Sequence, residues 1–107
     1  MGKLIAFGGV RMAKEMYVLL DSWGHGEYED YESDSDVLGV FETKELAEEA
    51  RKHVYDRTKE LEPSFEADEE EEYSYSITEL DRHGYEVDAS HTLQILRYQL
   101  NQLALMI

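Results

Sequence analysis

Residues 37–50, with the sequence VLGVFETKELAEEA, contain the junction that decides the predicted fold. The apolar run from Val37 to Phe41 is short and rich in β-forming residues, which predicts a strand. Thr43 follows at the position of a helix N-cap, and Glu45 lies in the first turn, where the helix dipole favours an acid. The stretch therefore predicts a strand that leads directly into a capped helix.

This helix is predicted to cover residues 43–61. Pro63 ends it, because the residue before a proline is disfavoured in the helical conformation. Glu48 and Lys52 are four residues apart and are expected to pair on the outer face. The apolar positions repeat at helical spacing and comprise Leu46, Ala47, Ala50, Val54, Thr58 and Leu61.

The residues before the junction predict a second strand paired with the first. Residues 16–20, MYVLL, are apolar and rich in β-formers, as in a buried strand. Residues 22–26 contain two glycines and predict a turn. We therefore expect an antiparallel hairpin that carries a long acidic loop.

Residues 73–80 alternate with period two, which predicts a half-buried strand with Tyr73, Tyr75, Ile77 and Glu79 on one face. His83 and Gly84 then indicate a turn, and residues 85–87 a short return strand.

The C-terminal residues are predicted to form a second helix, capped by Ser90. Its leucines follow the 3-4 spacing of a coiled coil, and the segment contains no acid, so two copies could approach each other. We expect this helix to mediate homodimerisation. The predicted interface residues are Leu93, Leu96, Leu100, Leu103 and Ile107.

Together these elements predict an α+β fold, in which a small antiparallel sheet of three to four strands carries two helices in the order β-β-α-β-(β)-α. The 107 residues suit one domain. That domain is expected to span residues 15–107, after a flexible leader at 1–14 and with an acidic connector at about 62–72.

The charge of the chain excludes several classes of function. Twenty-five acids against ten bases leave a net charge of −15, and every acid lies within residues 15–88. Phosphates would be repelled, so neither nucleic acid nor an anionic membrane is an expected partner.

The chain has no cysteine, which excludes thiolate catalysis and cysteine-ligated metals. No apolar run approaches the roughly 20 residues of a membrane span, and we expect a soluble, cytoplasmic protein.

No catalytic or cofactor-binding motif is present in the sequence. His25, His53, His83 and His91 are scattered and form no arrangement typical of nucleophilic catalysis. There is no phosphate-binding loop, and no enzyme activity, cofactor or metal is predicted. The alternating acids Asp30, Glu32, Asp34 and Asp36 resemble a calcium loop. Counted from Asp30, however, the sixth and twelfth residues are serine and phenylalanine instead of the required glycine and glutamate.

The acidic loop offers a regular geometry. In an extended backbone Asp30, Glu32, Asp34 and Asp36 point the same way at about 6.6 Å intervals. Such a row can imitate the phosphates of DNA, of which each strand presents one per 3.4 Å or so of helix axis. Neighbouring tyrosines would anchor a partner. The predicted partner-binding residues are Glu27, Tyr28, Glu29, Asp30, Tyr31, Glu32, Asp34 and Asp36, continued on the helix by Glu45 and Glu49.

Residues 17–20 and 38–50 resemble a block found in small bacterial and phage proteins of uncharacterised function. In that block a strand hairpin runs through a T/S-K-E sequence into an A-E-E-A helix. The resemblance implies an α+β fold and a bacterial or phage origin, and it carries no active site. In size and acidity the chain is also similar to phage inhibitors of the anti-CRISPR and anti-restriction type.

The sequence thus predicts a non-enzymatic acidic protein that binds a basic, nucleic-acid-binding protein, in the manner of a DNA mimic. Two alternatives stay open. The chain could be a structural or adaptor domain whose acidity serves solubility, or a regulatory protein that binds divalent cations weakly through its carboxylates.

Overall fold

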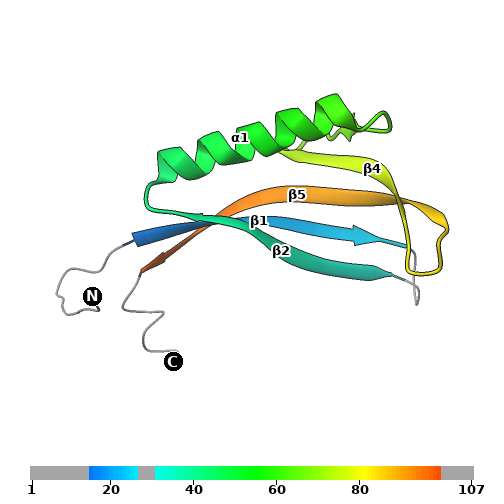
Figure 1. Ribbon diagram of the computed structural model, residues 1–107, viewed down its shortest axis with the longest axis horizontal. Coiled ribbons are helices and arrows are strands. Elements are labelled where there is room, and N and C mark those ends of the chain that lie inside the picture. The colour runs from blue at the N-terminus through cyan, green and yellow to red at the C-terminus, as the bar shows by residue number, and fades with distance from the viewer. Residues whose placement is uncertain (1–14, 27–30, 100–107) are drawn as a thin grey trace.

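The computed structural model describes residues 15–26 and 31–99, which form one antiparallel sheet with a single helix across one of its faces (Figure 1). The strand order is β2-β1-β5-β4-β3, so the longest strand, β5, is central and β2 is an edge. The elements are β1 (Glu15–His25), β2 (Glu32–Phe41), α1 (Lys44–Leu61), β3 (Glu66–Ala67), β4 (Ser74–Leu80) and β5 (Glu86–Gln99).

The core lies between α1 and the sheet face that the helix covers, which we call the helix side. Leu19 of β1 and Leu93 of β5 are 1% and 2% exposed, and Tyr75 of β4 completes the buried cluster. Ala47 is the buried contact residue of the helix. Half-buried residues surround the cluster, namely Phe41, Ala50, Val54, Tyr55, Phe65, Tyr73, Ile77 and Ile95.

The opposite sheet face, which we call the open face, carries no helix in the described part of the chain (Figure 1). Successive residues of a strand point to opposite faces, so the neighbours of Leu19 and Leu93 belong to it. Val18 lies between Val40 and Leu96 in the register of the three strands. A β-bulge beside Leu20 shifts the pairing of β1 with β2.

The predicted strand–cap–helix junction is confirmed. The Oγ1 atom of Thr43 accepts a hydrogen bond from the backbone N–H of Leu46 at 3.1 Å, as an N-cap does. The helix ends at Leu61, two residues before the proline. The expected pairing of Lys52 with Glu48 is replaced by an ion pair with Asp56, at 2.7 Å.

The predicted fold class is wrong in two respects, since the sheet has five strands and the described residues contain one helix. The expected C-terminal helix is strand β5, paired with β1 on one side and β4 on the other. Leu93 and Leu96 are three residues apart, and in a strand they point to opposite faces: Leu93 is in the core, and Leu96 is 37% exposed on the open face. The helical dimer seam therefore does not exist. Its remaining members, Leu100, Leu103 and Ile107, lie outside the described residues, as does the leader at 1–14.

The expected turn at residues 22–26 is also wrong, because Ser22–His25 continue β1: Ser22–Gly24 pair with both neighbouring strands, and His25 pairs with β2. Gly26, with a φ of 96°, follows the end of the strand.

The turn predicted at His83 and Gly84 is confirmed. Asp81 Oδ1 accepts hydrogen bonds from the backbone N–H groups of His83 and Tyr85, at 2.8 and 2.9 Å. These backbone donors favour the ionised carboxyl and lower its pKa. Gly84 takes a φ of 87°, which a glycine adopts without steric cost.

The alternation predicted for residues 73–80 is confirmed from Ser74 to Leu80, whereas Tyr73, with a φ of 62°, precedes the strand. Tyr75 and Ile77 contribute to the core and Glu79 lies on the same side. The acidic segment before β4 takes a definite path: β3 pairs with β4, and Asp68 Oδ1 accepts from the backbone N–H groups of Glu70 and Glu71.

Candidate functional site

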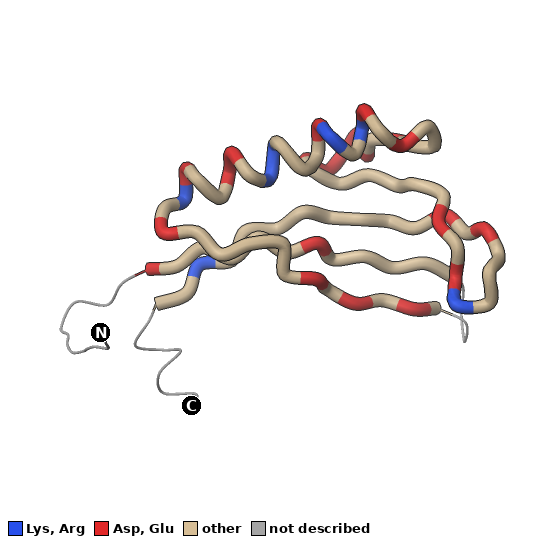
Figure 2. Tube along the Cα trace, viewed as in Figure 1, with Lys and Arg blue, Asp and Glu red and all other residues tan. Residues whose placement is uncertain are grey.

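Three acids of the predicted ladder share one side of an edge strand. Glu32, Asp34 and Asp36 alternate along β2 with serines, and their register with β1 places all three on the helix side. Asp34 and Asp36 are exposed, and the Glu32 side chain is 32% exposed. Figure 2 shows this run of acids along the edge of the sheet. We refer to Glu32, Asp34 and Asp36 as the acidic ladder.

Side chains of β1 hold the ladder in place. The indole Nε1 of Trp23 donates to Asp36 Oδ2 at 3.1 Å, and His25 Nε2 lies 3.6 Å from Glu32 Oε1. The rings of Trp23 and His25 stack with centroids 5.5 Å apart. Asp34, between the two held acids, accepts from the backbone N–H of Ser35 at 2.7 Å. The result is a row of oriented carboxylates.

Positive charge reaches only one end of the ladder among the described contacts. Arg82, from the β4–β5 turn, places its guanidinium 3.4 Å from Glu32 Oε2. This pair is partly exposed, so solvent weakens it. Asp34 and Asp36 have no ion pair among the described residues, and they are therefore the acids best placed to meet an external cation.

A buried histidine lies beside the ladder on the same sheet face. His91 is 8% exposed, and its Nδ1 and Nε2 atoms lie 2.9 Å from Asp21 Oδ1 and 2.5 Å from Glu79 Oε2. Burial acts to lower the pKa of His91, but the hydrogen bonds and negative charges of Asp21 and Glu79 together outweigh it and raise the pKa. Both ring nitrogens are occupied, so His91 joins three strands and has no free nitrogen for acid–base chemistry.

Tyr75 stacks on this histidine, with ring centroids 5.0 Å apart and nearly parallel planes. Burial, reinforced by the charge of Asp21, raises the pKa of Tyr75 to about 12. The phenol is therefore neutral at physiological pH.

The structure separates other residues that the sequence grouped with the ladder. Tyr31 is 56% exposed, and its hydroxyl lies where a side chain on Gly24 would project, on the open face. It is therefore not placed beside the carboxylates. Glu45 and Glu49 are exposed on α1, near the end of the sheet where β2 finishes, whereas the ladder occupies the start of β2 (Figure 1). Residues 27–30, with Glu27, Tyr28, Glu29 and Asp30, lie outside the described residues.

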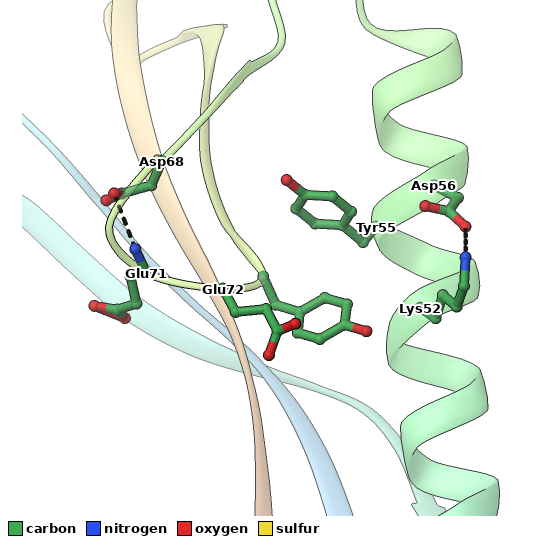
Figure 3. A pocket seen from close by; sticks show the side chains of 7 residues that line it. Lys52, Tyr55, Asp56, Asp68, Glu71 and Glu72 are labelled. Carbon is green, nitrogen blue, oxygen red and sulfur yellow. Dashed lines mark hydrogen bonds and ion pairs between the residues drawn. The ribbon is translucent and has the colours of Figure 1, made fainter.

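A second acidic surface, absent from the sequence-based predictions, lies between α1 and the turn that precedes β4. It is a groove of about 330 Å³ lined by Lys52, Tyr55, Asp56, Asp68, Glu71, Glu72 and Tyr73. Figure 3 shows Tyr55 and Glu72 projecting into the space between the helix and the turn. Tyr73 has a φ of 62° and also stacks beneath the Arg51 guanidinium, 4.2 Å away. The tyrosines were visible in the sequence, but their meeting with these acids depends on how the chain folds back.

Two further properties bear on the class of protein. Among residues 15–26 and 31–99, no group of three His, Asp or Glu side chains is arranged to hold a metal ion. The same residues include no helix that is long and apolar enough to cross a membrane.

No family model, curated protein or solved structure matches this chain. The functional argument therefore depends on the geometry and charge described above.

Proposed function

We propose that this chain is a non-enzymatic acidic binding protein that recognises a basic surface on another protein. The observation that carries the proposal is the acidic ladder, a row of oriented carboxylates along an exposed edge strand. An edge strand has a neighbour on one side only, so a partner can reach the ladder from the other side.

The spacing of the ladder favours a partner that normally binds nucleic acid. Side chains on one face of a strand recur every 6.6 Å or so, and the phosphates of one DNA strand advance by about 3.4 Å each along the helix axis while they wind around it. The two spacings are of the same order, so a groove whose lysines and arginines contact phosphates can also meet the carboxylates of the ladder. With a net charge of −15, the chain itself repels nucleic acid.

The groove of Figure 3 supports the same function at a second point. Its aromatic walls, Tyr55 and Tyr73, suit the stem and the charge of a lysine or arginine side chain, and Glu72 supplies a carboxylate.

The test uses charge reversal at two matched positions. Asp34→Lys plus Asp36→Lys inverts the ladder, and Glu69→Lys plus Glu70→Lys makes the same change of charge at exposed residues outside both the ladder and the groove. Each protein is immobilised and exposed to bacterial lysate at about 0.1 M and about 0.5 M salt, and retained proteins are identified by mass spectrometry.

The expected result is a set of nucleic-acid-binding proteins that the wild type and the control retain at low salt. The ladder variant should lose them, and excess duplex DNA should displace them, because the DNA competes for the same basic groove. Equal losses for the two variants would mean that overall charge, not the ladder, attracts the partner. Tight binding of the chain itself to duplex DNA in a mobility-shift assay would contradict the proposal.

A further inference from the structure

The open face carries exposed apolar side chains and a half that is free of charge, which is unusual in so acidic a chain. Val37 and Val40 are 63% and 53% exposed, and Leu96 is 37% exposed. A solvated face of an antiparallel sheet normally carries polar side chains. The apolar half of the open face comprises Met16, Val18, Leu20, Val37, Val40, Leu96 and Tyr98.

The other half of this face carries hydroxyl and amide groups that satisfy one another. Ser22 Oγ lies 3.1 Å from Ser35 Oγ and 3.4 Å from Gln94 Oε1. Ser74 Oγ and Thr92 Oγ1 are 2.8 Å apart. These groups have partners within the sheet, so covering them costs less than covering free polar groups.

Charged residues that share the open face, Glu66, Glu86 and Asp88, lie toward the corner formed by β3 and the β4–β5 hairpin, and Glu71 reaches its edge to accept a hydrogen bond from Ser74 Oγ at 3.1 Å. The face thus leaves its apolar half free of charge. The acids of the chain lie mainly on α1, on the turns and on the helix side of β2 (Figure 2).

We propose that the open face packs against the open face of a second copy of this chain, forming a homodimer of two stacked sheets. This interface differs from the predicted helical seam, since Leu93 is buried within its own chain and Leu96 alone is shared. It also does not depend on the proposed function, because it uses the opposite face from the ladder.

Charge favours a second copy as the occupant. A basic partner gains nothing from the apolar half of the face, whereas two copies of that half bring no charge opposite another. Stacked sheets lie about 10 Å apart, and the ladders and helices would point outward on either side. At about 0.15 M salt the screening length is about 8 Å, so repulsion between the two acidic surfaces is reduced but not abolished.

The area of the face is adequate for a stable dimer. Each position on one side of a sheet occupies roughly 33 Å², from about 4.8 Å between strands and about 6.8 Å along them. The uncharged positions of β1, β2, β4 and β5 then make roughly 600 Å² of flat surface, and the accessible area of their protruding side chains is larger. A standard interface buries about 800 Å² on each partner. A two-fold axis that lies between the two faces and parallel to them would make the contact self-complementary.

The test is sedimentation equilibrium of the full chain at about 0.05 M and about 0.5 M salt. We expect a dimer that becomes tighter as salt rises, because salt screens the repulsion between acidic copies. A basic partner held by the ladder would respond in the opposite sense, so the failure of one proposal is distinguishable from the failure of the other.

Two variants locate the interface. Val40→Lys plus Leu96→Lys should weaken dimerisation at least about 100-fold, although it lowers the net negative charge, because two cations would be buried without partners. Leu46→Lys plus Leu61→Lys makes the same change on α1 at exposed positions and should leave the dimer intact. Circular dichroism checks that each variant is folded. If the lysine variant does not fold, Val40→Thr plus Leu96→Thr supplies β-branched side chains that suit a strand and should still weaken the dimer about 10-fold.

Three results would overturn the proposal. The first is a wild-type monomer at about 100 µM in high salt. The second is an equal loss of dimer in the control on α1. The third is a wild-type monomer that dimerises once residues 100–107 are removed, which would show that the chain covers its own open face.

Discussion

Leu93 and Leu96 provide a sharp test of the strand geometry, because a helix would place their side chains on one face and a strand places them on opposite faces. In a helix seam the two leucines would contribute similarly to the free energy of unfolding. In β5 they point to opposite sides, and Leu93 is 2% exposed against 37% for Leu96. We therefore expect alanine substitutions at the two positions to differ strongly in their effect on the free energy of unfolding.

The magnitude follows from burial. Leu93→Ala removes three carbon groups, worth about 0.8 kcal/mol each when buried, or about 2.4 kcal/mol in total. The cavity left between α1 and the sheet raises the loss to about 3–4 kcal/mol. Leu96→Ala leaves no enclosed cavity, and its partial exposure limits the loss to about 1.5 kcal/mol. A domain with 5–15 kcal/mol of stability, the usual range, tolerates either change.

Urea denaturation followed by circular dichroism measures both losses. Protein at about 1 µM limits any contribution from dimerisation, which would make the effect of Leu96→Ala grow with protein concentration and leave that of Leu93→Ala unchanged. Losses that agree within about 0.5 kcal/mol would refute the alternation of β5 and support a helical seam instead.

Three other predictions concern the cap, a close approach and the histidine cluster. Thr43→Ala should cost about 0.5–2 kcal/mol in urea denaturation, because the first turn of α1 loses its side-chain acceptor. Gly39→Ala should cost about 1–3 kcal/mol in the same assay, because its Cβ would lie 2.7 Å from the Phe41 ring; an unchanged midpoint would mean that the ring moves freely. His91 has a raised pKa in the folded state, so its stabilising contribution is complete below its ordinary pKa and is lost as pH rises through the folded value. The melting temperature should therefore fall as pH rises above the ordinary histidine pKa of about 6.5, and Asp21→Asn should reduce that dependence; equal slopes in both proteins would contradict the assignment.

Local signals explain which elements could be predicted. Thr43 and Pro63 delimit α1 by short-range hydrogen bonding and sterics. Asp81 and Gly84 form the turn between β4 and β5 within a few residues. The period-two pattern before Leu80 was long enough to assign a strand and its buried face. Each of these depends on neighbours in the chain, which the sequence displays directly.

The candidate site was predictable only in part. The alternation of Glu32, Asp34 and Asp36 follows from an extended backbone, and the structure supplies that backbone. The position of Tyr31 on the other face follows from the same alternation, yet the sequence interpretation grouped it with the acids by proximity. The groove beside Tyr55 and Glu72 depends on a contact between α1 and a distant turn, which no local pattern encodes.

The sequence by itself determined the charge of the chain, the lack of cysteine chemistry, the helix and the strands with a clear period. Only the tertiary structure decided the state of residues 86–99. Their apolar residues fit a helical stripe and a two-sided strand almost equally, and the choice depends on hydrogen-bonding partners elsewhere in the chain. Two strands, β1 and β4, offer their backbone groups to this segment from either side, and the core needs Leu93 on one face. Because β1 lies tens of residues away in the chain, no local pattern shows that the segment becomes the central strand of the sheet.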